Sequence, residues 1–389
     1  MVGHAWRSLL FGIDGWRHYL KSGYAAASKR FDDAPFATDL RGRHVVITGA
    51  NQGIGYATAK QLASQNASVH MVCRDRARGE AALAKLRAEL APPPGTATTT
   101  AAGAGTPGPA LTLHVCDVSL QRDVAAFADA YARSGAPLHC LVNNAGCMVH
   151  ERTATREGVE TNFATNTLGA YNLTRLLEPA LRRAGAEARV VFVASAGALT
   201  ERLDVEDVES ERKKTFDATR AYAKQKRHQM ALCERFAEAE EESGKKKSVE
   251  TASTTTTEER KSLPGGKSGN DPVSGAGYSI GYYCMHPGWS DTEAVRVALP
   301  GFYDALKGKL RSPAEGADTV AWLCVAPKTE LRSGGFYLDR RETPAHVSAS
   351  AWFGTRYSRE DVDALIRVLD EKTEKALSHS DAPSTNNTP

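Results

Sequence analysis

The sequence carries no large excess of charge of either sign. Its 389 residues include 49 Lys and Arg against 46 Asp and Glu, a formal net charge of +3. A balance this close to neutral argues against a nucleic-acid-binding protein. Apolar residues make up 41% of the chain, which is enough for a real core and excludes wholesale disorder. The length suits one large α/β domain with extensions, or two small domains.

Closely spaced cysteine pairs are also missing. The seven cysteines are scattered along the chain and none has CxxC spacing, so the sequence predicts neither a metal site of the zinc type nor a disulfide framework. Most of them lie in apolar runs, where cysteine behaves as a small hydrophobic side chain. We therefore expect a reducing, intracellular location, first the cytoplasm, with a peripheral membrane or a mitochondrial location as alternatives.

Long apolar runs are absent as well. Stretches such as residues 190–199 are far too short to span a bilayer, and Asp14 interrupts the apolar N-terminal stretch, which argues against a signal peptide. Residues 1–35 form an aromatic-rich leader whose apolar side chains recur at helical spacing. We expect this amphipathic helix to pack on the main domain or on a second subunit. The alternatives are a helix that lies in a membrane interface with tryptophan anchors, and a mitochondrial presequence.

From residue 43 onward, apolar runs alternate with helical patterns. Such alternation is typical of a parallel sheet with helices on both faces, so we expect a doubly wound, three-layer α/β/α fold. The main domain is expected over residues 40–345, followed by a C-terminal helical extension over 346–377. Strands are predicted at 44–48, 68–73, 111–118, 138–145, 188–195 and 279–288, and helices at 55–66, 76–90 and 218–236.

Three stretches have the composition of disordered chain. Residues 91–110 contain only Ala, Pro, Gly and Thr, residues 238–277 are rich in Glu, Lys, Ser, Thr and Gly, and residues 378–389 form a polar tail. None of them can bury enough apolar surface to order itself. Because strands resume after each of the first two, we expect these two to be surface insertions within a single domain.

A glycine cluster follows the first predicted strand. Gly49, Gly53 and Gly55, in the stretch "TGANQGIG", lie between a strand and a helix. Glycine has no Cβ, so the backbone can turn tightly and approach a diphosphate, which then lies at the helix N-terminus. The strand–turn–helix context favours a dinucleotide site over a purely structural turn.

The spacing G-x-x-x-G-x-G resembles the glycine motif of short-chain dehydrogenases/reductases. Further motifs of that family follow in the same order: "NNAG" at 143–146, "ATNTLG" at 164–169, Ser195 after the fifth strand, "YAKQK" at 222–226 and "PGWSDT" at 287–292. Several ordered motifs are far more specific than any one of them. Phrases such as "NNAGCMV" and "YAKQKRHQ" resemble the member-12-like branch of the family. The resemblance covers most of the chain outside the insertions and the tail, and it implies a Rossmann-type fold, a nicotinamide cofactor and carbonyl–alcohol oxidoreductase activity.

The resemblance also implies where a nicotinamide dinucleotide binds. The diphosphate falls to the glycine turn, the adenine end to residues after strands two and three, and the nicotinamide end to residues after strands four and six. The expected cofactor-binding residues are Gly49, Asn51, Gln52, Gly53, Ile54, Gly55, Arg74, Asp117, Val118, Asn143, Ala145, Gly146, Tyr222, Lys226, Pro287, Gly288 and Thr292. By the same resemblance, Asn143 and Asn144 also stabilise the sheet.

The end of the second strand bears on the choice of cofactor. NAD-binding sites place an acid there for the ribose 2′-hydroxyl, but this chain has Cys73 followed by Arg74. A guanidinium matches the geometry of a 2′-phosphate, so NADP(H) is the preferred cofactor. NAD(H) is the alternative, because Asp75 would reverse the preference if it pointed inward.

Tyr222 is the candidate acid/base. Reduction of a carbonyl produces an alkoxide that needs a proton donor, and a nearby ammonium lowers the pKa of a tyrosine from about 10. On a helix, residues four apart share a face whereas residues two apart do not. Lys226 is therefore expected to act on Tyr222, and Lys224 to face solvent. By resemblance, Lys226 also bonds the nicotinamide ribose.

Two further catalytic residues are implied by the resemblance. Ser195 polarises the substrate oxygen, and Asn166 holds a water that links Lys226 to bulk solvent. The alternatives are a hydroxyl that caps a loop for Ser195 and a side chain that bonds the helix backbone for Asn166. The polar segment 199–219 is expected to form a flap, and residues 196–220 and 293–316 to line the substrate pocket.

Two functions compete at this point. The first is an NADP(H)-dependent oxidoreductase for a small-molecule carbonyl or alcohol, and the second is a non-catalytic NADP(H)-binding scaffold, membrane-associated through the leader. The intact Ser195, Tyr222 and Lys226 favour the enzyme. A related sugar-nucleotide epimerase would have TGxxGxxG spacing, for which Gly53 lies one residue late. Homo-oligomers are common in the family, and the pocket segments fit lipid, steroid or xenobiotic carbonyls equally well.

Overall fold

The computed structural model describes residues 2–91, 109–258, 280–347 and 354–379. At its centre is an eight-stranded sheet with the order β3-β2-β1-β4-β5-β6-β7-β8. All neighbouring strands are parallel except β7 and β8, which pair antiparallel. The strands are β1 His44–Thr48, β2 Ser68–Cys73, β3 Leu111–Val115, β4 Cys140–Asn143, β5 Arg189–Val193, β6 Gly281–Met285, β7 Phe336–Leu338 and β8 Arg341–Thr343.

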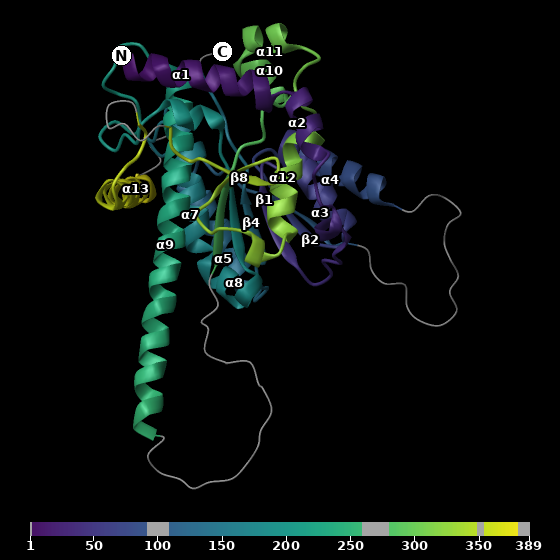
Figure 1. Ribbon diagram of the computed structural model, residues 1–389, viewed down its shortest axis with the longest axis vertical. Coiled ribbons are helices and arrows are strands. Elements are labelled where there is room, and N and C mark those ends of the chain that lie inside the picture. The colour runs from purple at the N-terminus through teal and green to yellow at the C-terminus, as the bar shows by residue number, and fades with distance from the viewer. Residues whose placement is uncertain (1, 92–108, 259–279, 348–353, 380–389) are drawn as a thin grey trace.

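Helices cover both faces of the sheet (Figure 1), so the predicted three-layer fold is confirmed. Alternate residues of β1 belong to different cores, because Val46 packs with one layer of helices and Ile47 with the other. One layer contains α3 Gly53–Ser64, α4 Arg76–Leu90 and α12 Pro313–Val325, and the other contains α5 Gln121–Arg133, α7 Gly169–Leu176 and the start of α9 Ala218–Glu258. The strand order reverses between β1 and β4, and a crevice at the carboxyl ends of strands opens at such a point.

The shorter elements connect these layers at the two ends of the sheet. They are η2 Ala34–Ala37, α6 Thr161–Phe163, η3 Ala164–Leu168, α8 Glu178–Arg183, η4 Gly185–Glu187, η5 Ala196–Thr200, α10 Glu293–Ala298, α11 Pro300–Leu306 and η6 Lys328–Glu330. Of these, η5 follows β5 directly and α10 follows the loop after β6. Both therefore lie at the carboxyl edge of the sheet, where ligands bind in folds of this class.

Sequence patterns did not predict the hairpin of β7 and β8. Its two-residue turn is Asp339-Arg340, and both residues have positive φ values, 50° and 58°. A left-handed backbone at non-glycine residues costs free energy and must be held by other contacts. Arg311 binds Asp339 with two hydrogen bonds of 2.6 and 2.9 Å, and Arg340 binds Asp318. The turn thus depends on partners that are distant in sequence and that no local turn signal reveals.

Helix α9 is longer than expected. It continues to Glu258 and extends beyond the body of the protein (Figure 1), so it includes residues 238–258 of the stretch for which the composition predicts disorder. Ion pairs anchor its middle, because Glu240 binds Arg182 and Glu242 binds Arg359. Glu, Ala and Lys in this stretch are also good helix formers. Residues 259–277, and 92–108 of the other predicted insertion, lie outside the described residues.

The two ends of the chain fold back onto the main body. The leader forms α1 Val2–Asp14, η1 Gly15–Tyr19 and α2 Lys21–Ser28, and α1 lies across one end of the molecule beside α10 and α11 in Figure 1. Helix α13 Arg359–Ser378 contacts α5 and α9, and its Leu365 and Leu369 share an apolar cluster with Leu232 of α9. Within the described ranges, no helix combines the length and the apolar character needed to cross a membrane.

Candidate active site

The glycine turn lies where β1 ends and α3 begins. Gly49 has a φ of +65°, and a Cβ on it would lie only 3.1 Å from Ala145 Cα. A Cβ on Gly55 would lie 2.4 Å from the carbonyl oxygen of Gly49. Gly53 has a φ of +56° and opens α3, with Thr292 on its far side. These close neighbours and positive φ values require glycine, and the turn leads directly into the N-terminus of α3.

Side chains at the ends of β1 and β4 lock this turn in place. Asn144 Nδ2 donates to the carbonyl oxygens of Thr48 and Gly49, at 2.8 and 3.3 Å. Thr48 Oγ1 accepts from the N–H groups of Asn144 and Ala145. Asn143 instead turns its side chain toward α7, where Nδ2 donates to Thr174 Oγ1 at 3.0 Å. The side chain of Asn143 therefore braces the sheet.

At the end of β2, Asp75 caps a helix. Its carboxylate accepts from the N–H of Arg78 at 2.8 Å, which fixes it at the start of α4. Cys73 is buried beside the N–H groups of Ala50 and Asn51, and burial raises the pKa of its thiol to about 11. Arg74 is 73% exposed, and its Nε lies 4.0 Å from Asp117 Oδ2. The strand end thus presents a neutral thiol and a solvent-accessible guanidinium.

The loop after β6 lies at the same carboxyl edge of the sheet as the glycine turn. Gly288 has a φ of +67°, and a Cβ on it would lie 2.4 Å from Arg311 Nε. Thr292 Oγ1 accepts from the N–H of Val295 and caps α10, while its methyl group faces Gly53. The loop is also tied to the leader, because the N–H of Trp289 donates to Tyr19 O at 2.8 Å. The leader therefore helps to fix the loop that would face a nicotinamide.

Lys226 lies one helical turn after Tyr222, as the spacing predicted. Its Nζ lies 5.4 Å from the centre of the Tyr222 ring and donates to Val193 O at 2.8 Å. Val193 ends β5 and precedes Ser195 by two residues, so Lys226 lies against the strand end that carries Ser195. Ser195 Oγ accepts from the N–H of Gly197 at 3.2 Å and caps η5.

Burial dominates the acid–base properties of this pair. It raises the pKa of Tyr222 above its ordinary value of 10, and it lowers the pKa of Lys226 to about 8. The direction for Tyr222 is opposite to the expectation from the sequence. The reason is that the phenol is withdrawn from water, while the ammonium donates to Val193 O and Gln229 Oε1.

Lys224 was expected to face solvent, and this was wrong. Its side chain is 14% exposed, and Nζ lies 2.6 Å from Asp204 Oδ2. Asp204 belongs to the polar segment 199–219, which folds back against this side of α9. Lys224 and Lys226 lie on different sides of α9, as helix geometry predicts. Lys224 is nevertheless covered by the non-helical segment that contains Asp204.

Asn166 belongs to η3, a turn with π-helical bonding. Its side chain bonds the backbone of Cys147 in both directions: Oδ1 accepts from the N–H at 2.9 Å and Nδ2 donates to the carbonyl at 2.8 Å. Two residues that the sequence analysis did not assign complete the contacts. Nδ2 also donates to Gln225 Oε1, and the main-chain carbonyl of Asn166 accepts from Gln229 Nε2 at 2.6 Å. Both glutamines lie near Lys226 in the stretch "YAKQKRHQ". Their position on the buried side of α9 is the signal that could have identified them as part of the site.

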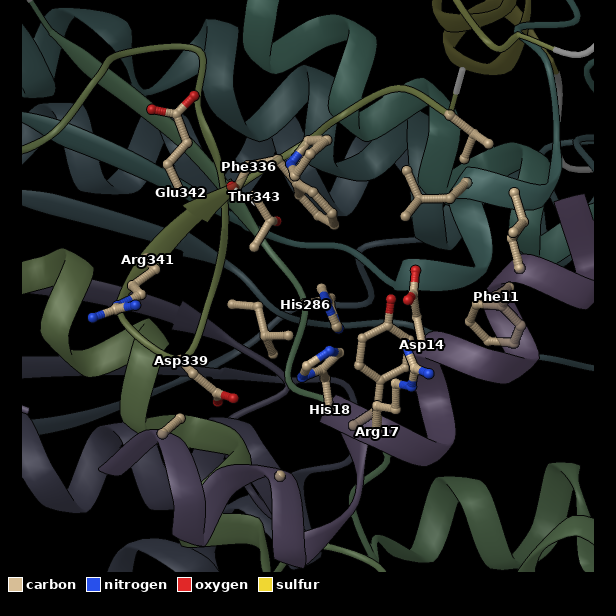
Figure 2. Close-up of a pocket in the computed structure, with 18 of the residues that line it drawn as sticks. Phe11, Asp14, Arg17, His18, His286, Phe336, Asp339, Arg341, Glu342 and Thr343 are labelled. Carbon is tan, nitrogen blue, oxygen red and sulfur yellow. Dashed lines mark hydrogen bonds between the residues drawn. The ribbon is translucent and has the colours of Figure 1, made fainter. Parts of the chain in front are cut away.

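A cavity of about 620 Å³ lies beneath the leader (Figure 2). Phe11 and His18 of the leader line it, together with His286 after β6 and residues of the β7–β8 hairpin such as Phe336 and Thr343. Ser195, Tyr222 and Lys226 are not among the described residues that line it. This cavity is therefore separate from the catalytic candidates, although His286 immediately precedes the Pro-Gly turn.

Comparison with known proteins agrees with this geometry. Residues 43–205 match the short chain dehydrogenase family. The protein is 37% identical to dehydrogenase/reductase SDR family member 12 of Bos taurus, over 94% of this chain and 97% of the relative. It is 28% identical to retinol dehydrogenase 12 of Homo sapiens, over 78% of this chain and 80% of the relative.

A solved structure extends the likeness in fold. The Pseudomonas aeruginosa RhlG/NADP active-site complex matches with a TM-score of 0.52 at 19% identity, over 78% of this chain and 96% of that chain. Together with the glycine turn and the ordered motifs, the sequence matches leave one assignment. The chain belongs to the short-chain dehydrogenase/reductase family, and it is an oxidoreductase that acts between CH–OH and C=O groups.

Proposed function

We propose that this oxidoreductase uses NADP(H) to interconvert a small-molecule carbonyl and an alcohol, with Tyr222 as the acid/base. The observation that carries the proposal is the position of Lys226. It lies one turn from Tyr222 and against the strand end that bears Ser195, at the same edge of the sheet as the glycine turn. A proton donor, a hydroxyl and a fixed cation at the mouth of a dinucleotide crevice are the groups that carbonyl reduction requires.

The residues of the crevice fit a nicotinamide dinucleotide. The turn from Gly49 to Gly55 would hold the diphosphate, since its glycines allow close backbone approach. Lys226 uses two of its three N–H donors on Val193 and Gln229, and the third suits a ribose hydroxyl. When bound, the nicotinamide supplies or accepts the hydride.

Side chains of this protein would supply the proton that the substrate oxygen needs. A raised pKa keeps Tyr222 a neutral phenol at neutral pH, and a neutral phenol is a proton donor. Ser195 would hydrogen-bond the substrate oxygen and orient it toward the phenol. Asn166 and Cys147 bond one another beside Gly146, which also borders the Lys226 ammonium.

The preference for NADP(H) rests on three neighbouring residues. Cys73 puts a buried, neutral thiol where an acid would bind a ribose 2′-hydroxyl, and Asp75 is engaged as the cap of α4. Arg74 is exposed and available to a 2′-phosphate. NAD(H) lacks that phosphate and would gain nothing from the guanidinium.

The test combines a cofactor titration with an assay of turnover. Fluorescence titration should give tighter binding of NADPH than of NADH, and a carbonyl panel should include a substrate that the wild type reduces and Tyr222→Phe does not. If NADPH binds but both proteins are equally inactive on every carbonyl, the non-catalytic scaffold replaces this proposal. If NADH binds more tightly, the role of Arg74 is wrong.

One observation favours a peripheral membrane contact as an additional property. Helix α1 and the start of η1 expose a row of large apolar side chains, with Trp6, Leu9, Ile13 and Trp16 between 42% and 57% exposed. Lys309 Nζ lies 5.4 Å from the centre of the Trp16 ring, so a cation borders the row. Tryptophans beside basic groups suit the headgroup region of a bilayer.

Flotation with vesicles that contain anionic lipid tests this contact. The double variant Trp6→Ser, Trp16→Ser should lose most of the vesicle-bound fraction, whereas Leu377→Ser removes an exposed apolar side chain of α13 and should not. If the wild type fails to float and sediments as a dimer that the double variant abolishes, the row is instead a contact between subunits.

A further inference from the structure

The ammonium of Lys226 is nearly sealed inside the protein. The residue is 2% exposed, and Nζ donates to Val193 O at 2.8 Å and to Gln229 Oε1 at 3.2 Å. A buried ammonium costs several kcal/mol unless acceptors satisfy its N–H groups. Val193 contributes a main-chain carbonyl that any residue would supply. Gln229 contributes a side-chain oxygen, so the second acceptor of the Lys226 ammonium depends on which residue stands at position 229.

The other end of the Gln229 amide has an equally definite partner. Nε2 donates to the main-chain carbonyl of Asn166 at 2.6 Å, and Gln229 is completely buried. An ammonium can only donate and a carbonyl can only accept, so the amide has one orientation that satisfies both. Gln229 therefore joins Lys226 in α9 to Asn166 in η3 through a bridge that cannot be reversed.

This bridge ends on the main-chain carbonyl of Asn166, the residue to which family resemblance assigns a water. A water accepts a proton on one lone pair and releases another, so it can pass protons along a chain. A side-chain amide that donates through nitrogen and accepts through oxygen does not do this, because transfer would require an unstable imidic acid form. The contact between Gln229 and Asn166 thus fixes geometry and charge and carries no proton.

We propose that Gln229 is a positioning residue that keeps the Lys226 ammonium charged and aimed at the cofactor crevice. The inference rests on the proposed function, because it assigns Lys226 to a bound ribose. Gly146 borders the same ammonium, since a Cβ there would lie 3.5 Å from Nζ and 3.1 Å from Asn166 Oδ1. With Val193 and Gln229 holding two donors, the remaining N–H is confined to the side of the crevice.

The test measures NADPH binding by fluorescence between about pH 6 and pH 10. Binding should weaken on the alkaline side as Lys226 loses its proton. In Gln229→Leu the ammonium loses an acceptor, so this alkaline limb should move about one pH unit lower. In Gln229→Glu a carboxylate beside the ammonium favours the charged form, so the limb should move about one unit higher, although the donor to Asn166 is lost. Opposite shifts from two changes at one position are not expected from a purely structural role.

Gln225→Leu is the matched control. Gln225 is equally buried on the same helix, but it bonds the side chains of Asn166 and Glu160 and has no bond to Lys226. It should lower the melting temperature without moving the alkaline limb.

If all variants share the wild-type limb, or if Gln225→Leu moves it as far as Gln229→Leu, the inference is wrong. A wild type that binds no NADPH at any pH overturns the proposed function and this inference with it. Should Gln229→Leu fail to fold, the near-isosteric Gln229→Glu decides alone, and an unmoved or lowered limb contradicts the proposal.

Discussion

Two polar networks of this protein, one buried and one partly buried, differ in whether they hold a charge. At the carboxyl edge of the sheet, Lys226 holds an ammonium among neutral oxygens. On the face covered by α5, three histidines form a row across β1, β2 and β3. His44 Nδ1 lies 3.1 Å from His70 Nε2, and His70 Nδ1 lies 3.0 Å from His114 Nε2. A neutral His70 can donate to one neighbouring histidine and accept from the other, so the row needs no charge.

The difference follows from the partners. Carbonyl oxygens around Lys226 favour the charged form and partly offset the burial that lowers its pKa to about 8. The histidines have mainly one another and the rings of Tyr131 and Phe127, and burial lowers the pKa of His70 to about 3. Burial alone therefore does not decide whether a titratable side chain is charged or neutral. The hydrogen-bonding chemistry of the atoms that contact it decides this.

Removal of the ammonium should have the largest effect. Lys226→Ala is expected to lower kcat/KM about a hundredfold or more, because both the ribose contact and the cation beside Tyr222 are lost. Lys224→Ala breaks the ion pair with Asp204 and should leave kcat within about twofold. Steady-state assays on a carbonyl that the wild type reduces give the comparison, and equal losses in the two variants would refute the separate roles of the lysines.

Acid should act on the histidine row. The unfolded chain takes up protons near pH 6.5, whereas folded His70 does so only near pH 3, so stability is complete above pH 6.5 and falls as the pH drops below it. His70→Gln keeps hydrogen-bonding groups without a titration. Between pH 7.5 and pH 5 it should lose about 1–2 kcal/mol less unfolding free energy than the wild type.

Urea denaturation at the two pH values measures this difference. His379→Gln, a change at an exposed histidine of the C-terminal end, is the control and should behave as the wild type does. An acid response of His70→Gln identical to that of the wild type would mean that the row does not exclude protons.

The smallest effect is expected at the rim of the carboxyl edge. Arg74→Ala should weaken NADPH binding about tenfold and leave NADH binding nearly unchanged, because the exposed guanidinium meets only a 2′-phosphate. The unfolding free energy should change little. Fluorescence titrations with both cofactors measure the ratio, and a parallel loss for NADPH and NADH would place Arg74 on the shared diphosphate instead.

Regular patterns allowed a large part of this structure to be predicted. The apolar runs located β1 to β6, and the four-residue spacing placed Lys226 on the side of Tyr222. What escaped prediction depends on contacts between distant segments. Asp204 covers Lys224 from a segment without periodicity, and Arg311 holds Asp339 in a left-handed turn. Gln229 lies in a stretch that the family resemblance included. Its role nevertheless depends on its hydrogen bond to the main-chain carbonyl of Asn166, 63 residues earlier in the chain.

The contacts of the leader determine when it can dock during synthesis of the chain. Tyr19 O accepts from Trp289 N–H and from Arg311 Nε, and Gly15 packs against the Trp289 ring. A ribosome makes these partners only after some 270 further residues have been added, and domains fold as their segments emerge. The leader therefore cannot dock, and the side chain of Tyr19 stays exposed to solvent, until most of the chain has been synthesised. During that interval a chaperone or a nearby lipid surface can reach the leader before the rest of the protein does.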